Sequence, residues 1–447
     1  MKNKLLLSIS IYRLQILIAL TCSLLLGQRS FAVDLQEVYQ MALENDAQYQ
    51  QIVASNLATR EQKPQAWSQL LPNVSLNAST ENQNSVSSGG FGFGGEFDTN
   101  AHNYSFRLTQ PLFHWDRYLQ LKKADATILR SDAQLLAAEQ QLMIRAAEAY
   151  FNILRAMDNL TFARAETLSL NRTLEQTQQR FDVGLTAITD VQEQRAGYDN
   201  AVAREIAAEN DVDNTREALR EIIGNYVVSF EILVDEIPLV SPQPESIEEW
   251  TNTAQEQNLD IIAAMHAVDS ARQQVKINKA GHLPTIDVNA SKGYNKSGGR
   301  FGANKNKSEN IGLQLTVPLF QGGAVTSRTR ESIHLLDQEI QRLEQARRAS
   351  QRATRLAYLG VISGISQVKA YLQSVVSSET ALEATEAGFD VGRRTAVDVV
   401  AAERNLSNAK RNLAGARYDY LLNTLRLKQS AGILTPEDIA SVNQLLE

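Results

Sequence analysis

FDVGLTAITDVQEQRAGYDNA (residues 181–201) occurs a second time, in the same register, as FDVGRRTAVDVVAAERNLSNA (residues 389–409). Phe181 aligns with Phe389. At the same offset Gly184 aligns with Gly392, Asp190 with Asp398 and Ala201 with Ala409. The two copies are separated by nearly half of the 447-residue chain. This spacing predicts one structural unit used twice.

Each copy is typical of a turn between two helices. Gly184 and Gly392 stand where a helix ends and the backbone needs a left-handed residue. Thr189 and Asp190 follow in the first copy, and residues 395–398 in the second, and these residue types suit the start of a new helix. We expect two hairpin tips at equivalent places. From the residues alone, the glycines need be only caps and the aspartates only first-turn carboxylates.

Long helical patterns run into and away from both tips. Residues 116–180 and 324–387 have the spacing of three and four, and each would span on the order of 100 Å as a helix. Return helices are expected over 189–223 and up to residue 431. In the last of these, apolar residues fall seven apart, at Val399, Leu406, Leu413, Tyr420 and Leu427. This spacing predicts a coiled-coil seam, so the long helices pack along one another.

Four short segments change to an alternating pattern. Residues 73–80, 104–110, 285–291 and 311–317 alternate apolar with polar side chains, which predicts half-buried strands of ten residues or fewer. They form two expected hairpins, about 73–110 and 285–317. The Gly- and Ser-rich residues 85–97 are predicted to be a loop with a mobile tip.

A basic segment joins the second pair of strands. It is predicted to be a solvated surface loop, and contact with lipopolysaccharide phosphates is the alternative. Its cations are Lys292, Lys296, Arg300, Lys305 and Lys307.

Residues 1–32 are typical of a signal peptide. Lys2 and Lys4 precede an apolar run, and residues 30–32 (SFA) offer a cleavage site. The run is short for a membrane anchor, which is the alternative. Cys22 is the only cysteine and lies within this segment, so the mature chain is expected to have no disulfide and no thiolate site.

The remaining chain divides into two repeats with short additions. We expect a first repeat over 33–223, a connector over 224–245, a second repeat over 246–431 and a C-terminal segment over 432–447. The two repeats open with helical patterns over 33–71 and 246–280. The connector contains three prolines and short β-like runs.

Composition argues against several functions. A net charge of −7 disfavours nucleic acid as a partner. The sequence contains no nucleophile motif and no phosphate-binding glycine loop, so we expect neither an enzyme nor a bound cofactor. The five histidines are scattered without metal-ligand spacing: His102, His114, His266, His282 and His334.

Four strands cannot close a barrel, yet alternating strands suit an outer membrane, where open sheet edges are not tolerated. We therefore expect a mainly α protomer with a pair of membrane β-hairpins. Three copies would close a twelve-stranded barrel, continued by a helical tunnel in the periplasm. Aromatic residues near the strand ends would form an interfacial belt or be ordinary packing at the barrel–tunnel junction: Phe113, Trp115, Tyr118 and Phe320.

The sequence resembles the TolC family of outer-membrane efflux channels over essentially the whole mature chain. LTQPLF and LTVPLFQGG fit the strand-to-helix junctions of that family. The duplicated order of the motifs makes the resemblance specific, although each motif is weak alone. The other matching segments are residues 179–192, 281–291, 391–400 and 416–425.

The resemblance implies a homotrimer in the bacterial outer membrane that extends into the periplasm. Such channels are passive exit ducts for multidrug efflux and type I secretion. An inner-membrane efflux transporter or ABC exporter supplies energy, and a periplasmic adaptor docks on the helical tips. Outer-membrane lipid surrounds the strands. The docking positions would be Gly184, Leu185, Gly392 and Arg393.

The resemblance also implies a latch that closes the entrance. Thr189 and Asp190 on the first tip would pair with Phe389 and Arg394 on the second. Phe389 stands where the family pattern has a tyrosine, so Arg394 should carry more of the latch.

The family pattern also implies carboxylates at the constriction. Asp398 matches the first of two aspartate positions, and Ala401 replaces the second. One carboxylate ring would remain, without a resident metal but open to block by multivalent cations.

Two other functions are weighed against the duct. A structural coiled-coil spacer or adaptor would not be expected to have paired amphipathic strands. A general diffusion porin would not be mostly helix. The exported substrate is not predicted by the sequence.

Overall fold

A computed structural model describes residues 32–87, 95–299 and 302–447. Residues 1–31 of the expected signal peptide, with Cys22, lie outside these ranges. So do residues 88–94 of the predicted first loop, and Arg300. The other residues of that predicted loop, 85–87 and 95–97, are strand, because they pair with one another in the backbone ladder.

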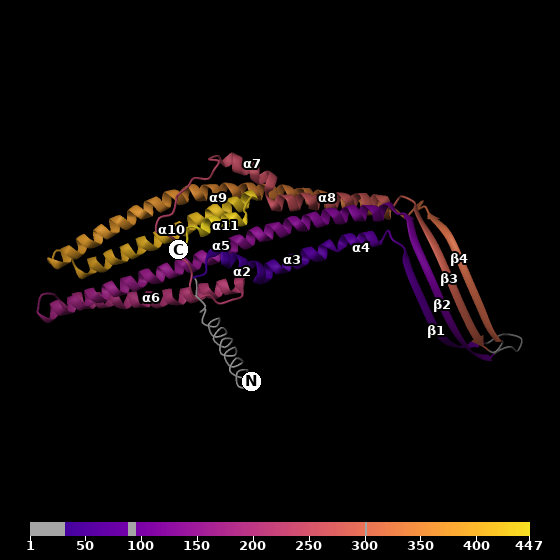
Figure 1. Ribbon diagram of the computed structural model, residues 1–447, viewed down its shortest axis with the longest axis horizontal. Coiled ribbons are helices and arrows are strands. Elements are labelled where there is room, and N and C mark those ends of the chain that lie inside the picture. The colour runs from indigo at the N-terminus through magenta and orange to yellow at the C-terminus, as the bar shows by residue number, and fades with distance from the viewer. Residues whose placement is uncertain (1–31, 88–94, 300–301) are drawn as a thin grey trace, which may run out of the picture.

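Two very long helices run most of the length of an elongated molecule (Figure 1). They are α5 (Trp115–Asp182, 68 residues) and α9 (Ala324–Asp390, 67 residues), each about 100 Å long. Beyond the two tips the chain returns in α6 (Ile188–Ile223) and α10 (Ala396–Ala431). The predicted long helices and their turns are therefore present. Among the described residues, no helix combines the length and apolar character needed to cross a bilayer.

The opening helices of both repeats are broken where the sequence predicted continuous ones. Asp46 accepts a hydrogen bond from the backbone N–H of Tyr49 (2.6 Å) and starts a new helix, and Arg145 binds the Asp46 carboxylate through both nitrogens. Asn258 caps the second break in the same way. The resulting helices are α2 (Leu35–Asn45), α3 (Ala47–Arg60), α4 (Gln62–Ser68), α7 (Ile247–Gln257) and α8 (Leu259–Ala280).

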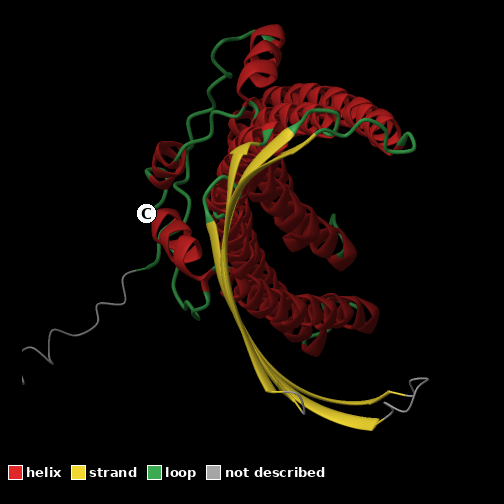
Figure 2. Ribbon diagram, turned by 90° about the vertical axis from the view of Figure 1, so that its right-hand side faces the viewer, coloured by secondary structure: helices red, strands yellow, loops and turns green. Residues whose placement is uncertain are grey.

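Both hairpins join one curved antiparallel sheet in the order β1-β2-β3-β4 (Figure 2). Its strands have 15, 19, 15 and 15 residues, so the predicted limit of about ten residues is wrong. The basic segment is also strand rather than loop, because Lys296 pairs directly with Lys305 in the β3–β4 ladder. The strands are β1 (Asn73–Ser87), β2 (Gly95–Phe113), β3 (Thr285–Gly299) and β4 (Gly302–Thr316).

Four aromatic side chains are exposed near the end of the sheet that joins the helices. Phe113 ends β2, and the rings of Trp115 and Tyr118 stack at a centroid distance of 5.1 Å. Phe320 follows β4. Their exposure in the single chain is compatible with the expected interfacial belt and with packing against a neighbouring copy at the junction.

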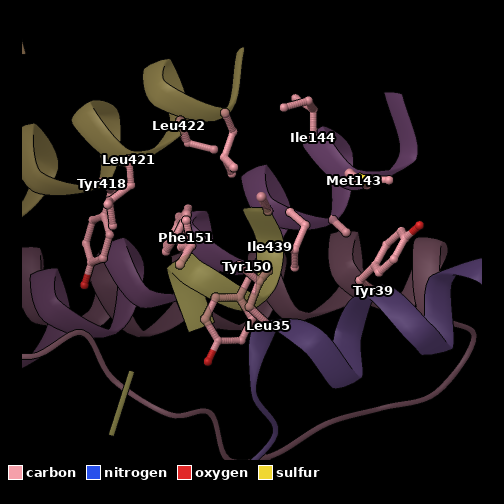
Figure 3. Packing of buried hydrophobic residues seen from close by; sticks show 14 of the residues in the cluster. Leu35, Tyr39, Met143, Ile144, Tyr150, Phe151, Tyr418, Leu421, Leu422 and Ile439 are labelled. Carbon is pink, nitrogen blue, oxygen red and sulfur yellow. The ribbon is translucent and has the colours of Figure 1, made fainter. Parts of the chain in front are cut away.

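The hydrophobic core lies where α2, α5 and α10 come together in the middle of the molecule (Figure 1), and Figure 3 shows its packing from close by. Tyr150 and Phe151 of α5 are fully buried among side chains of α2, α6, α10 and the C-terminal helix α11 (Pro436–Asn443). The Tyr150 hydroxyl donates to the carbonyl oxygens of Val33 (3.2 Å) and Glu231 (2.8 Å). Strand-like bridges of the connector, Val33 to Phe230 and Leu233 to Leu446, cover this core.

Candidate functional site at the helical tips

Both tips end a long helix with the same backbone geometry. Gly184 has φ +78° and Gly392 has φ +74°, the left-handed conformation that glycine adopts at low cost. The next residue closes a six-residue loop in each copy: Leu185 N–H donates to Arg180 and Arg393 N–H donates to Gly388, both at 2.8 Å. The predicted glycine caps are confirmed.

The two return helices start differently. In the second tip, Thr395 and Asp398 form a capping box, in which Asp398 accepts from the Thr395 backbone N–H at 2.9 Å. In the first tip, Ala187 occupies the equivalent cap position and provides no side-chain bond. There the Thr186 hydroxyl donates to Asp190 instead, and Thr189 lies inside the first turn of α6.

Arg180 links the two tips within one chain. Its guanidinium lies 2.7 Å from the Asp390 carboxylate and 5.1 Å from the ring centroid of Phe389. The cation therefore pairs with a charge and an aromatic face at the end of α9. Asp390 is mostly exposed, so we expect this ion pair to hold the tips only weakly.

A second contact joins the starts of the two return helices. The buried Gln194 side chain of α6 donates to the carbonyl oxygen of Ala396 at 3.0 Å. One turn further, a Cβ on Gly197 would lie 3.1 Å from a methyl group of Val400, so the helices approach closely. Below the tips, α6 and α10 are held by packing as well as by polar contacts.

A buried carboxylate connects three helices further from the tips. Glu166 of α5 has a side chain 1% exposed and contacts Arg204 of α6 and, at 3.7 Å, Arg411 of α10. This ionic cluster ties the first helical hairpin to the second.

The proposed latch residues lie on the tips but do not meet in the single chain. Among the residues that the structure describes, no hydrogen bond or ion pair joins Thr189 or Asp190 to Phe389 or Arg394. The Arg394 stem instead packs against Gly388, and a Cβ there would lie 2.8 Å from Arg394 Cγ.

Arg394 and Asp398 line one polar groove between α9 and α10. Its volume is about 340 Å³, and hydroxyl-bearing and small side chains line the rest of it, including Thr385 and Ala401. Hydrogen bonds from the Thr395 backbone and hydroxyl, with the nearby Arg394 charge, lower the pKa of Asp398 below its usual range. Asp398 is thus ionised at neutral pH. Within the described ranges, no three histidine, cysteine or acidic side chains gather closely enough to hold a metal ion.

Sequence reasoning missed Arg180 and Asp390. The repeat contains a signal for Arg180 but not for Asp390, which aligns with a second aspartate, Asp182. Arg180 aligns with Gly388, so a cation stands before Phe181 where the second copy has no side chain. This difference between the copies is one of several at the two tips.

Comparison with known families agrees with the duplicated architecture. A model for outer membrane efflux proteins matches residues 38–225 and 250–433, one match in each half. The chain belongs to the outer membrane efflux protein family. Members of this family are outer-membrane channels without enzymatic activity, so this protein is an outer-membrane protein and not an enzyme.

Relatives of this efflux protein are similar over most of their length. It is 38% identical to outer membrane protein TolC of Vibrio cholerae, over 96% of this chain and 98% of that protein. It is 31% identical to the alkaline protease secretion protein AprF of Pseudomonas aeruginosa, over 94% and 88%. The solved structure of VceC from V. cholerae has a TM-score of 0.75 at 19% identity, covering 89% of this chain and 96% of that one, and shows the same fold.

Proposed function

We propose that this efflux protein is a passive, trimeric exit duct for multidrug efflux and type I protein secretion. The observation that carries the proposal is the position of the sheet, which lies at the opposite end of the helices from the two tips (Figure 1). One end suits a membrane and the other suits an entrance. Three copies would supply twelve strands and leave no open sheet edge in the bilayer.

The relatives support both transport roles. A protein named for alkaline protease secretion is 31% identical, which favours a role in protein export. The family model is named for efflux. Energy would come from an inner-membrane efflux transporter or ABC exporter, because the sequence contains no nucleotide-binding motif.

The tips are the proposed entrance. Thr189, Asp190, Phe389 and Arg394 would form the latch between neighbouring copies, since in the described part of one chain no hydrogen bond or ion pair joins the first two to the last two. Asp398 from each copy would form one carboxylate ring, which favours cations. The Arg180–Asp390 contact would add a link inside each copy.

Single-channel conductance in a planar bilayer tests the duct and its gate. We expect small cation-selective openings for the wild type, larger ones for Arg394→Ser, and loss of divalent-cation block for Asp398→Ala. Asp398→Asn keeps an oxygen for the helix cap and removes the charge, so it should also lose the block. Arg393→Ser is the matched control, because Arg393 is exposed and outside the proposed latch.

The conductance measurements test the duct and the gate separately. A protein that neither inserts nor conducts would contradict the duct and favour an envelope spacer. Wide wild-type openings that ignore Arg394 and Asp398 would leave the duct standing and refute the proposed gate.

Adaptor docking is proposed at the tip turns, around Gly184, Leu185, Gly392 and Arg393. Leu185 is 77% exposed, an apolar side chain at the outermost turn, as a partner contact would require. Leu185→Asp should abolish cross-linking to the adaptor in cells while leaving conductance of the purified channel unchanged. Equal cross-linking would place the adaptor elsewhere.

A further inference from the structure

We propose that Lys296, Lys305 and Lys307 form a binding surface for the phosphate groups of outer-leaflet lipid. The three side chains lie on strands β3 and β4, on the face of the sheet that also carries its apolar residues. The inference rests on insertion of this sheet in the outer membrane, as the proposed function requires.

Strand register separates the two faces of the sheet. Directly paired residues of antiparallel strands point to the same face. One face carries polar side chains across all four strands, as in the row Ser75, Arg107, Ser291 and Asn310. The other face carries the exposed apolar side chains Val74, Leu76, Phe106, Ile311, Leu313 and Leu315. Lipid would contact this second face.

The apolar face changes character along the strands. It begins at Phe113, which pairs with Ile286, and reaches the stacked rings of Tyr104 and Tyr294, 6.4 Å apart. Lys307 pairs with Tyr294 in the same row. Apolar rows bounded by aromatic rings at both ends are typical of the lipid-facing band of an outer-membrane sheet.

The next row lies at the height of the headgroups. Lys296 is ten residues along β3 from Ile286, and its partner Lys305 is ten residues along β4 from Leu315, which pairs with Ile286. Ten residues span about 34 Å at about 3.4 Å per residue. With a strand tilt of about 40°, the vertical distance is about 25 Å, the usual height of the apolar band. The two ammonium groups would therefore project where lipid phosphates lie.

Within residues 32–87, 95–299 and 302–447, no ion pair neutralises Lys296, Lys305 or Lys307. Lys296 and Lys305 face each other directly across the ladder, which is unfavourable for like charges. No carboxylate in the part of the chain that the structure describes pairs with either of them, or with Lys307. By contrast Lys292, two rows from Lys296 and inside the band that the tyrosine row bounds, is neutralised by Glu309 at 2.6 Å. An anionic ligand would relieve the repulsion that remains.

The position favours lipid over free phosphate. The cations border an apolar surface, so a ligand with acyl chains gains burial as well as charge pairing. Each lysine near an anionic lipid surface contributes about fivefold to binding, or on the order of 100-fold for three.

Native mass spectrometry of the full-length protein in uncharged detergent tests the proposal. The probes are diphosphorylated lipid A, dephosphorylated lipid A and inorganic phosphate. We expect the wild type to bind diphosphorylated lipid A, and the triple variant K296Q/K305Q/K307Q to bind it on the order of 100-fold more weakly. The matched control K276Q/K279Q/K369Q removes three exposed, unpaired cations from helices α8 and α9 and should bind like the wild type.

Further variants keep the test decisive. K296R/K305R/K307R retains the charge and should retain binding. If the glutamine triple variant does not assemble, K305Q alone removes one of the facing pair and should weaken binding about fivefold.

Three results would overturn the inference. One is unchanged binding of diphosphorylated lipid A by the glutamine variants. Another is equal binding of dephosphorylated lipid A by the wild type, which would leave no role for phosphate. The third is equally tight binding of inorganic phosphate, which would indicate an ion site instead. Normal wild-type conductance alongside any of them would leave the proposed duct intact.

Discussion

In the middle of the molecule and at its tips, a helix is followed by a glycine, but the glycine in the middle is tightly packed and the one at the tip is not. Gly432 follows α10 in the middle with φ +80°, and Gly392 follows α9 at the tip with φ +74°. A Cβ on Gly432 would lie 2.2 Å from the carbonyl oxygen of Gln257, whereas nothing lies within 4 Å of one on Gly392. The middle is a close-packed joint, and the tip is open.

The contacts that hold each region differ in the same way. Aromatic side chains such as Tyr150 and Phe151 pack the middle at ring distances near 6 Å. The tips are joined by an exposed ion pair, Arg180 to Asp390, and by the Gln194 side chain. Packed apolar surface resists separation more than exposed ion pairs do. Substitutions in the middle should therefore change stability, and those at the tips should change gating.

The largest expected effect is that of Gly432→Ala. The left-handed backbone and the overlap with Gln257 should together reduce the free energy of unfolding by about 3 kcal/mol or more. Gly392→Ala, the matched substitution at the tip, adds only backbone strain, about 1 kcal/mol. Guanidinium unfolding followed by circular dichroism compares them. Equal losses would contradict the contrast between joint and tip.

Loss of the buried carboxylate should have the next largest effect. Glu166→Gln leaves Arg204 and Arg411 without a counter-charge, and we expect a loss of about 2 kcal/mol, moderated because both arginines reach solvent. Glu209→Gln is the control, since Glu209 and its partner Arg164 are exposed. The same unfolding experiment measures both. If Glu209→Gln lowers the free energy of unfolding as much as Glu166→Gln does, the effect of Glu166 does not come from its burial.

Breaking the tip contact should affect the channel more than the fold. Asp390→Ala removes an exposed ion pair, so the free energy of unfolding should fall by less than about 1 kcal/mol. Single-channel recordings should show more frequent openings, because α5 and α9 are then less tightly joined. At the equivalent position of the first tip, Asp182 accepts a hydrogen bond from Gln178 of its own helix, so Asp182→Ala should gate normally. Identical recordings for both variants would show that the Arg180–Asp390 contact has no role in gating.

The smallest expected effect concerns the two helix starts. Thr395→Ala removes the capping box, and the first turn of α10 should exchange amide hydrogens a few-fold faster. Ala187→Thr adds a cap residue to the first tip and should slow exchange at the start of α6.

The cap should also depend on pH. The pKa of Asp398 is lower in the folded protein than its ordinary value of 3.8, so the cap stabilises the helix above that value. The stabilisation is lost as the pH falls through the lower folded value. The effect of Thr395→Ala should therefore be present at pH 6 and shrink below about pH 4. An effect that grows in acid would reverse the assigned sign.

Features that depend on neighbouring residues were predictable from the sequence. The glycine turns follow from Gly184 and Gly392, because the left-handed backbone is a local requirement. The long helices follow from their periodicity, and the apolar parts of the strands follow from alternation. These predictions agree with the structure because each rests on residues within a few positions of one another.

Features that depend on distant partners were not predictable. The Asp46 carboxylate at the helix break binds Arg145, 99 residues away, and the tip contact joins Arg180 to Asp390, 210 residues apart. The strands continue past their apolar rows because backbone pairing does not require apolar side chains. The alternating pattern therefore predicted strands that are too short.

The sequence by itself determined a duplicated, mainly helical outer-membrane channel. The repeat, the helices and the turns follow from residue types that lie close together in the chain, and the outer-membrane assignment follows from the alternating strands and the family resemblance. Only the tertiary structure decided which side chains meet. In the structure Arg180 lies over the ring of Phe389, and Arg394 lines the groove between α9 and α10. The segment predicted to be a basic loop pairs as strands β3 and β4. The physical reason is that contacts across hundreds of residues are set by packing of whole helices and by strand register, which no short segment specifies.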